Sequence, residues 1–565
     1  MAAGICPCGQ TVTLRAVIRW CAFKKLKIQD SWKRRANCCD GRPANEDGFR
    51  IEDREHLALR PQRSIYNPAH PLAAEFAAVG LAMLLAGGCA VGPDFKKPAA
   101  PNVSSYTVAP LATTAATTNV VGGAAQSFIN GVNIQGDWWT LFHSPALNEL
   151  IRESISNNPD LKSAQAALTM ARENVLAQRG NFFPSVSANF AATRQKQSEA
   201  LAPVPNYPAV PNAFQYNLFT PQLNIAYSPD VFGANRRSME SLKAQEQGVR
   251  YQLAAAYTTL TANVVVTAIQ QGAVEMQIEA TRQLVDLNSN MVEILRYQVD
   301  KGYASRLDFL AQESQLAQVV AALPPLLKQA AQLRDQLAAL AGRFPNQAPA
   351  DKFELSGLQL PAVLPVSLPS QLVEQRPDVL QAEANLHAAC AQIGVAVANR
   401  LPNITLTADA GSSALAIDKL FTSGTGFWGI GAAATAPIFD GGTLLHQERA
   451  ARAAYQQAAA QYRSTVLTAF QNVADTLVAL EQDAEGLKTA ALAEQDAHAT
   501  LELSQRQLHD GYISYLALLS AQQAYRQAQI TLVQAQANRY ADTAALFQAL
   551  GGGWWHQAEL TRENQ

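Results

Sequence analysis

Two very long stretches of the chain carry the hydrophobic pattern of an α-helix without a single proline. They run from Gly233 to Gly302 and from Gly441 to Gly511, and at 1.5 Å per residue each would span roughly 100 Å. Within the second stretch, apolar residues recur in alternating steps of four and three, the spacing of a coiled-coil seam: Val466, Phe470, Val473, Leu477 and Leu480. We therefore expect two long helices that pack along their length against other helices.

Three shorter stretches alternate apolar and polar residues, the period of a β-strand. They follow Pro184, end at Tyr227 and follow Pro402, and a fourth predicted strand, Phe427–Ala432, is rich in glycine. Such alternation over about ten residues is typical of a barrel strand with one face in lipid, and a half-buried strand in a soluble sheet has the same pattern. Four strands are too few to close a membrane barrel, which needs about eight or more. Several copies would have to share one barrel, and counting does not choose between two copies and three.

The chain contains an internal duplication. Segment 159–168 resembles 377–386, and segment 302–307 resembles 511–516. Each half is therefore predicted to run short helix, strand, strand, long helix, turn, medium helix. The short and medium helices together match the long helix in length, so we expect them to stack end to end along it, with the strands at one end and the glycine turns at the other. The predicted ranges of these shorter helices are 154–181 and 303–343 in the first half, and 372–399 and 512–550 in the second.

The amino-terminal region has the pattern of a secretion signal. Arg60 and Arg63 precede an apolar run, Phe76–Ala86, which is followed by two glycines and Cys89. Small residues before a cysteine are what lipoprotein processing requires, so we predict that Cys89 is acylated and begins the mature chain. The alternative is a buried cysteine at the end of a helix. Residues 99–127, rich in Ala, Thr and Pro without a period, are expected to form an extended linker.

Composition and the absence of known motifs narrow the classes of function that the chain could have. Only 16% of the residues are charged and the net charge is −2, so nothing indicates nucleic acid. The sequence has no nucleotide-binding loop, zinc-protease helix or serine-hydrolase elbow, and its amino-terminal cysteines lack partners at zinc spacing. The body has no apolar run of 18 or more residues, the length of a membrane-spanning helix. We therefore predict a protein without cofactor or catalytic activity, held at a membrane by a barrel or a lipid anchor.

Six motifs occur in an order typical of one family: Cys89–Pro98, Trp138–Leu147, Leu340–Pro345, Leu368–Asp378, Ala436–Gly442 and Ala549–Trp554. With them the chain resembles the outer-membrane efflux proteins, which are TolC-like, in the NodT-type lipoprotein branch. The resemblance implies an α+β membrane protein, a homotrimer in which a long α-helical coiled-coil barrel joins a transmembrane β-barrel with four strands per chain. It also implies passive conduction, with outer-membrane lipid, a periplasmic membrane-fusion adaptor protein and an inner-membrane RND pump as partners. The alternatives are the duct of a type I protein secretion system and a lipid-anchored coiled-coil scaffold without a pore.

The resemblance also assigns a role to the two helix reversals. Gly302 and Gly511 stand where a helix C-cap needs positive φ. In the family such reversals dock onto the adaptor, and the residues implied beside them are Leu307, Asp308 and Leu516.

Two further positions have expected roles. Relatives often carry an aspartate ring at the closed periplasmic end of the pore, and at the commonest of these positions this chain has Ser520, which implies a less acidic gate. Trp428, on the last predicted strand, is expected at the membrane interface. The expected segments are 1–88 (extension and signal), 89–145 (anchored linker and equatorial segment), 146–345 (first repeat), 346–370 (inter-repeat linker), 371–555 (second repeat) and 556–565 (tail).

Overall fold

The computed structural model describes residues 90–109, 111–196, 215–348 and 353–557. The chain divides into two units, Met1–Ala90 and Val91–Gln565, and every described residue except Ala90 belongs to the second. The predicted acylation site, Cys89, lies outside the described residues.

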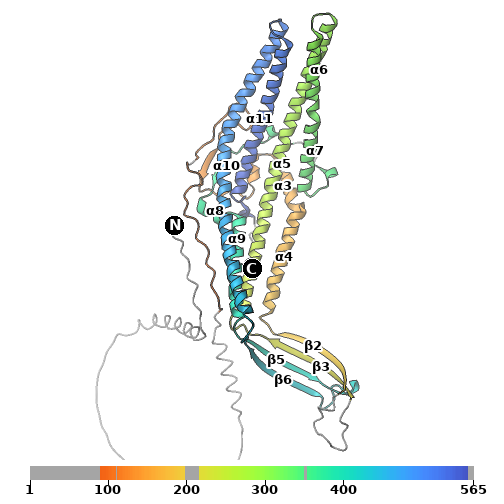
Figure 1. Cartoon of the computed structure of the whole chain (residues 1–565), viewed down its shortest axis with the longest axis vertical. Coiled ribbons are helices and arrows are strands. Elements are labelled where there is room, and N and C mark those ends of the chain that lie inside the picture. Colours follow the sequence, from red (N-terminus) through yellow and green to blue (C-terminus); the bar gives the residue numbers. More distant parts are fainter. Residues whose placement is uncertain (1–89, 110, 197–214, 349–352, 558–565) are drawn as a thin grey trace, which may run out of the picture. The chain divides into compact units, whose positions relative to one another are not determined.

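The first repeat is built around α5 (Ala234–Asp300), a helix of 67 residues. One part of α5 packs against α3 (Pro145–Asn157) and α4 (Pro159–Gly180), and the rest packs against α6 (Arg306–Ala321) and α7 (Leu323–Leu340) (Figure 1). The predicted end-to-end stacking of shorter helices along a long one is confirmed.

In the first repeat, each of the two shorter predicted helices, 154–181 and 303–343, is broken once, near a proline. The side chain of Asn158 accepts hydrogen bonds from the two backbone N–H groups that follow Pro159, so it ends α3 and caps α4. α6 gives way to α7 at Ala322, just ahead of Pro324. The prediction of unbroken helices was wrong here because proline lacks an N–H group and disfavours helical geometry in the residue before it.

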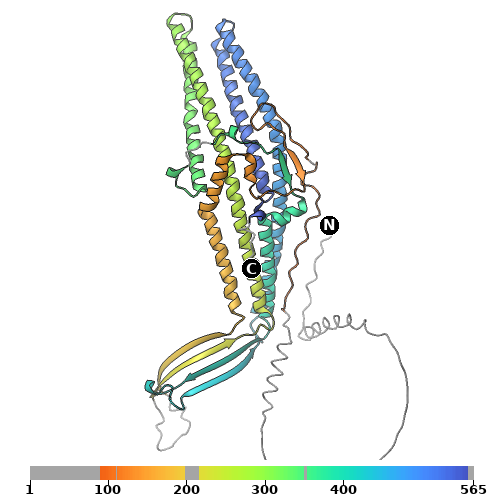
Figure 2. The same ribbon diagram turned by 180° about the vertical axis from the view of Figure 1, so that it is seen from behind.

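The second repeat has the same order. α8 (Pro369–Gln375) and α9 (Pro377–Ala398) precede two strands, and α10 (Thr443–His509), also 67 residues long, leads into α11 (Tyr515–Ala549). The predicted helix 372–399 is therefore broken as well, at Arg376, the residue before Pro377. Both α9 and α11 pack on α10 and on α5 (Figures 1 and 2). Four residues of the predicted coiled-coil seam are buried and Phe470 is half-buried, as expected.

The two stacks of helices are joined in the same way. In the first repeat, Asn158 Nδ2 donates a hydrogen bond to the carbonyl oxygen of Leu340 over 3.0 Å. In the second, Arg376 Nη1 donates to the carbonyl oxygen of Ala549 over 2.9 Å. Both donors precede a proline at the start of a helix, and both acceptors belong to the end of the returning helix, where backbone C=O groups lack partners within the helix. The duplication thus extends to single hydrogen bonds.

By length and composition, one helix in the described part of the chain, α5, is apolar enough to cross a membrane. Within its apolar stretch, 67% of the residues are buried inside the chain. Side chains such as Val264, Ala268 and Ile269 belong to the main core, together with Trp138 and Phe547 from other segments. This burial accounts for the apolar composition of α5 as that of a core helix.

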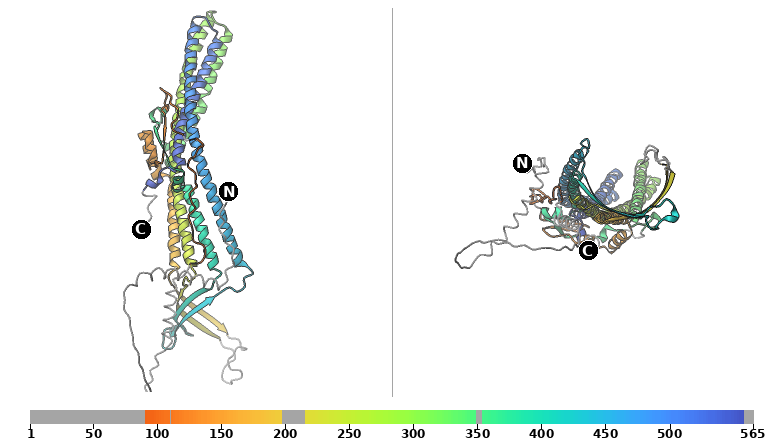
Figure 3. Two further views of the ribbon diagram at one scale, coloured as in Figure 1. Left: turned by 90° about the vertical axis from the view of Figure 1, so that its left-hand side faces the viewer. Right: turned by 90° about the horizontal axis from the view of Figure 1, so that it is seen from below.

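The four predicted strands form one antiparallel sheet in the order β2-β3-β5-β6. They are β2 (Ser185–Lys196), β3 (Gln215–Tyr227), β5 (Asn403–Ser412) and β6 (Gly426–Thr435). The central pair, β3 with β5, joins the two repeats. Viewed from below, the sheet forms a curved arc (Figure 3).

A second, small sheet was not predicted. β1 (Ser127–Asn130) pairs in parallel with β4 (Val363–Val366), which lies within the segment expected to be a linker between repeats. The segment expected to be an extended linker is also fixed to the body: Arg539 Nη2 donates to the carbonyl oxygen of Ala124 over 2.7 Å, and Gln126 Nε2 donates to Thr543 Oγ1 over 3.1 Å. The first of these segments is therefore held in place by α11.

Candidate functional site: a two-faced sheet and two helical tips

The four-stranded sheet has one apolar face and one polar face. Residues paired across antiparallel strands point to the same side, so a row of partners reports one face. Two rows that cross all four strands are entirely apolar: Val186–Ile225–Ala408–Ile430 and Ala188–Leu223–Ala410–Trp428. The row between them carries polar side chains or none: Ser187–Asn224–Asp409–Gly429.

The apolar face is left uncovered by the other residues that the structure describes. Ile430 is 80% exposed and Trp428 77% exposed. The strands are 10 to 13 residues long, enough for the 9–11 residues of a tilted strand to cross a bilayer. A large exposed apolar surface is unfavourable in water and favourable against lipid. Trp428 lies on this face, and its place at the membrane interface stays a prediction.

Both edges of the sheet are free within the part of the chain that the structure describes. β2 and β6 are its outer strands. β2 starts next to the helices, just after Phe183, whereas β6 ends next to them, just before Ile438 and Phe439. These three side chains are 63%, 99% and 92% exposed, respectively. Unpaired edges beside bare apolar side chains are typical of a surface that another chain completes.

The two helix reversals are matching turns. Gly302 has φ +79° and Gly511 has φ +80°. The N–H of Tyr303 donates to Gln298 and that of Tyr512 to Gln507, each over 2.8 Å to a backbone carbonyl oxygen, which is the 6→1 hydrogen bond of a Schellman motif. A Cβ added at either glycine would meet no atom within 4 Å. Glycine is required here by the backbone conformation alone.

The tips expose apolar and aromatic side chains at equivalent places. Leu307 is 76% exposed and Leu516 68% exposed, and Tyr303 and Tyr512 are 82% and 80% exposed. The sequence reasoning named the leucines and missed the tyrosines, although both repeats contain the same Gly-Tyr pair. Asp308 has a local structural role, because Ser305 Oγ donates to its carboxylate over 2.7 Å and accepts from its N–H over 3.1 Å. This reciprocal pair caps α6.

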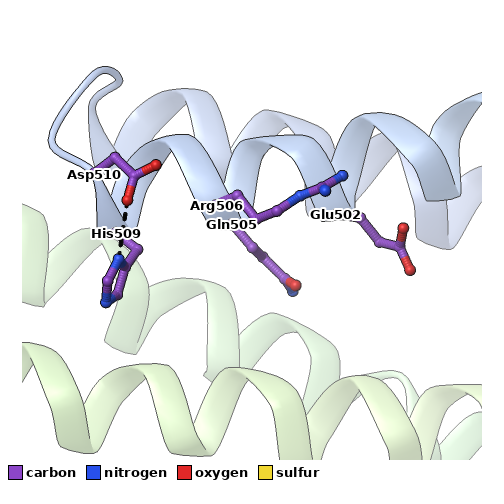
Figure 4. Close-up of a pocket in the computed structure, with 5 residues that line it drawn as sticks. All are labelled: Glu502, Gln505, Arg506, His509 and Asp510. Atoms are coloured by element: carbon purple, nitrogen blue, oxygen red, sulfur yellow. Dashed lines mark hydrogen bonds and ion pairs between the residues drawn. The ribbon is translucent and has the colours of Figure 1, made fainter.

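Ser520 lies exposed on the second turn of α11, and its hydroxyl donates to the carbonyl oxygen of Leu516 over 3.1 Å. The first turns of α11 contain no acidic residue. The charge at this tip lies on the end of α10 instead, where a surface hollow is lined by Glu502, Gln505, Arg506, His509 and Asp510 (Figure 4). The imidazole Nδ1 of His509 lies 3.1 Å from Asp510 Oδ1.

The described residues contain no group of three or more His, Cys, Asp or Glu side chains that could hold a metal ion. His387 is paired with Glu240 over 2.9 Å. Cys390 is a buried free thiol, as expected for a small core residue on a helix, and burial raises its pKa. These side chains serve packing and ion pairing.

Comparison with known proteins identifies the family. The model of the family described as outer membrane efflux protein matches residues 150–343 and 368–552. The chain is 30% identical over 480 residues to the probable efflux pump outer membrane protein TtgC of Pseudomonas putida, with 83% of this chain and 94% of that protein covered. It is 26% identical to the probable outer membrane lipoprotein SilC of Salmonella typhimurium, with 83% and 97% covered.

A solved structure gives the same result. The outer-membrane channel OprN superposes with a TM-score of 0.72 at 25% identity, covering 82% of this chain and all of that chain. The matched segments include the sheet and both helical stacks described above. The chain therefore belongs to the outer membrane efflux protein family and is an outer-membrane component of an efflux pump.

Proposed function

We propose that the chain forms, as a homotrimer, the passive exit duct of a tripartite RND-type efflux pump. The observation that carries this proposal is the sheet with one apolar face, one polar face and two free edges. A membrane-spanning sheet must close, because unpaired backbone groups are not tolerated in lipid. Four strands cannot close alone, and three copies would give a ring of twelve with an even strand number.

The direction of the edge strands suits closure between copies. β2 runs away from the helices and β6 runs toward them, so β6 of one copy and β2 of the next would pair antiparallel, like every other pair in the sheet. The apolar face would continue around the ring outside, and the polar face would line the lumen. Phe183 of one copy would then meet Ile438 and Phe439 of its neighbour.

The helical part supports the same assembly. Four of the exposed apolar side chains of α10 are spaced by 11, 14 and 11 residues, which places them on one side of an α-helix at 3.6 residues per turn: Leu467, Val478, Leu492 and Leu503. A stripe of this kind beside the buried seam is suited to contact with a helix of a second copy. A coiled-coil scaffold without a pore would not account for a sheet with one apolar face and one polar face.

The partners follow from this assignment. A duct needs a source of substrate, and the exposed leucines and tyrosines of the tips lie at the end of the helices opposite the sheet (Figure 1). We assign them to docking of a periplasmic adaptor, which connects the duct to an inner-membrane pump. TtgC is named as an efflux pump protein and SilC as a lipoprotein, which favours efflux over protein secretion and supports acylation at Cys89.

Three measurements test the duct. Purified protein in gentle detergent should have the mass of a trimer and should give steady single-channel currents in planar bilayers. Phe183→Cys combined with Phe439→Cys should yield disulfide-linked trimers on non-reducing gels. Either substitution alone serves as the control, because the two positions flank opposite edges of the sheet in one chain. A monomer or dimer without conductance, and no cross-linking beyond that of the single variants, would refute the proposal.

A further inference from the structure

The apolar face of the four-stranded sheet becomes basic at the end far from the helices. On β2, every second side chain from Val186 to Ala192 is apolar and points to this face. The next two side chains on the same face are those of Arg194 and Lys196, and both are exposed. The pairing of β2 with β3 is unbroken from Ser185 to Lys196, so no bulge turns these two side chains to the other face.

Two amide side chains of β3 lie directly beside the two basic side chains. Arg194 is the cross-strand partner of Asn217, and Lys196 is that of Gln215. Cross-strand partners on one face have Cβ atoms about 5 Å apart, and the next pair on that face follows about 7 Å along the strand. The four side chains therefore form one cluster of two cations and two amides, here called the basic patch. All four groups donate hydrogen bonds.

The basic patch contains all the charge on its side of the sheet. On the four described strands, no residue of the apolar face other than Arg194 and Lys196 is charged. The polar face of these strands carries one charged residue, Asp409. No carboxylate of the described strands therefore lies on the apolar face to neutralise the two cations. The patch has a net positive charge where the apolar surface stops.

The basic patch is about one membrane thickness away from the helices. β2 runs from the helices to the far end of the sheet (Figure 1), and Lys196 is its last residue. On β3, the apolar face extends from Tyr227, beside the helices, to Phe219, which covers roughly 26 Å along the strand at about 3.3 Å per residue. A strand tilt of about 40° reduces this to a height of about 20 Å, close to the apolar band of about 25 Å in outer-membrane barrels. The patch therefore stands at the level of the lipid headgroups on the membrane surface opposite the helices.

The lipid on that surface has the chemistry that the patch and the apolar face require together. The outer leaflet of a bacterial outer membrane contains lipopolysaccharide, whose lipid A headgroup is a phosphorylated disaccharide that carries several acyl chains. Guanidinium and ammonium groups bind phosphate through charge-assisted hydrogen bonds, and exposed apolar side chains are favourable against acyl chains. A free phosphate would leave the apolar face unused, and a zwitterionic lipid would leave the net positive charge of the patch without a counter-charge.

We propose that the basic patch binds a phosphate group of lipid A in the outer leaflet, and that acyl chains of the same molecule lie against Phe190 and Phe219. This rests on the proposed closure of the sheet into a membrane barrel. The two rings belong to the apolar face directly below the patch, and Phe190 is 57% exposed. Each copy of the chain contributes one such site, which fixes the far rim of the sheet at the level of the outer headgroups.

Native mass spectrometry of the purified full-length protein in detergent tests this, with diphosphoryl lipid A as the probe. We expect lipid A to stay bound to the unmodified protein. Arg194→Ala combined with Lys196→Ala should weaken binding by about tenfold, and lipid A without its phosphates should bind the unmodified protein equally weakly. Arg194→Lys keeps the charge and should retain most of the binding. Arg179→Ala is the matched control, because Arg179 is an exposed arginine at the end of α4, beside the opposite end of the sheet.

Equal binding of lipid A by the unmodified protein and the double variant would overturn the site, as would equal binding of lipid A with and without phosphates. Displacement of lipid A by inorganic phosphate, or equally firm binding of phosphatidylglycerol, would overturn the assignment to lipid A. Single-channel currents separate this proposal from the duct, because both basic side chains face away from the lumen and their loss should leave conductance unchanged. A conducting trimer that retains no lipid A overturns the site and leaves the proposed function intact. A monomer without conductance overturns the proposed function, and with it the position of the patch in the membrane.

Discussion

A pair of carboxyl groups inside the helical bundle should make stability fall as pH rises. Asp483 on α10 faces Asp542 on α11, and Asp483 Oδ2 is buried without a donor among the described residues. Burial, together with the hydrogen bond to Asp542 and its charge, raises the pKa of Asp483 to about 7, while Arg539 opposes the shift. A proton shared between the two carboxyl groups satisfies the buried oxygen. The pair is thus most stable when it holds that proton.

The sign and the size of the effect follow from linkage. An unfolded aspartate has a pKa of about 3.9, so between about pH 4 and pH 7 the folded chain binds more protons than the unfolded chain and loses stability as pH rises. Three pKa units correspond to about 4 kcal/mol at most. Asp483 is half-buried, and solvent screening reduces the expected loss to about 1–2 kcal/mol per chain. The loss is complete above about pH 7.

Asp483→Asn removes the titrating group while keeping a side chain that can donate a hydrogen bond. We expect the variant to be more stable than the unmodified protein above about pH 7 and to show a flatter dependence of Tm on pH from about pH 5 to pH 8.5. Asp475→Asn, at an exposed position of the same helix, is the control. Equal loss of Tm with rising pH in the unmodified protein and the Asp483→Asn variant would refute the reasoning.

Three further outcomes are expected. Gly342→Ala should lower Tm more than Gly302→Ala. Both substitutions cost about 1–2 kcal/mol of left-handed backbone strain, but only at Gly342 (φ +71°) would the new Cβ also clash, at 2.7 Å from the carbonyl oxygen of Asn157. Equal losses of Tm would contradict the packing argument. Ser520→Asp should raise cation selectivity and divalent-ion block in single-channel recordings if the serine faces the pore, and unchanged currents would show that it does not. Cys89→Ala should abolish acylation, seen by mass spectrometry, while trimers still form in membranes, since the sheet also holds the chain there.

Much of the fold was predictable because local patterns encode it. The equal lengths of α5 and α10 follow from proline-free stretches between glycines, and the alternation around Val186 and Leu223 encodes strands whose two faces differ. The breaks at Asn158 and before Pro324 could have been predicted as well, since proline ends helices for reasons visible in the sequence. These features depend on neighbours a few residues apart.

The parallel pair of β1 and β4 and the course of Val91–Lys97 along α9 were not predictable in this way. The bonds from Gln126 to Thr543 and from Arg237 to Val91 join residues far apart in the chain. Such contacts are formed by packing, and no hydrophobic periodicity in the sequence predicts them. In the sequence, Arg237 is one of two adjacent arginines at the start of a predicted helix, and only the folded structure distinguishes its contacts from those of Arg236.

The two repeats differ at the connection between the second strand and the long helix, and the difference indicates where a second copy of the chain would bind. In each repeat, the second strand turns into a long helix through a short connection. In the first repeat, the N–H of Val91 donates a hydrogen bond to the carbonyl oxygen of Phe232 in that connection. In the second, nothing in the described chain covers Ile438 and Phe439, which are 99% and 92% exposed. Two equivalent connections with equally apolar side chains have the same need for burial. In the proposed trimer the neighbouring copy would cover the second connection, whereas Val91 of the same chain binds the first.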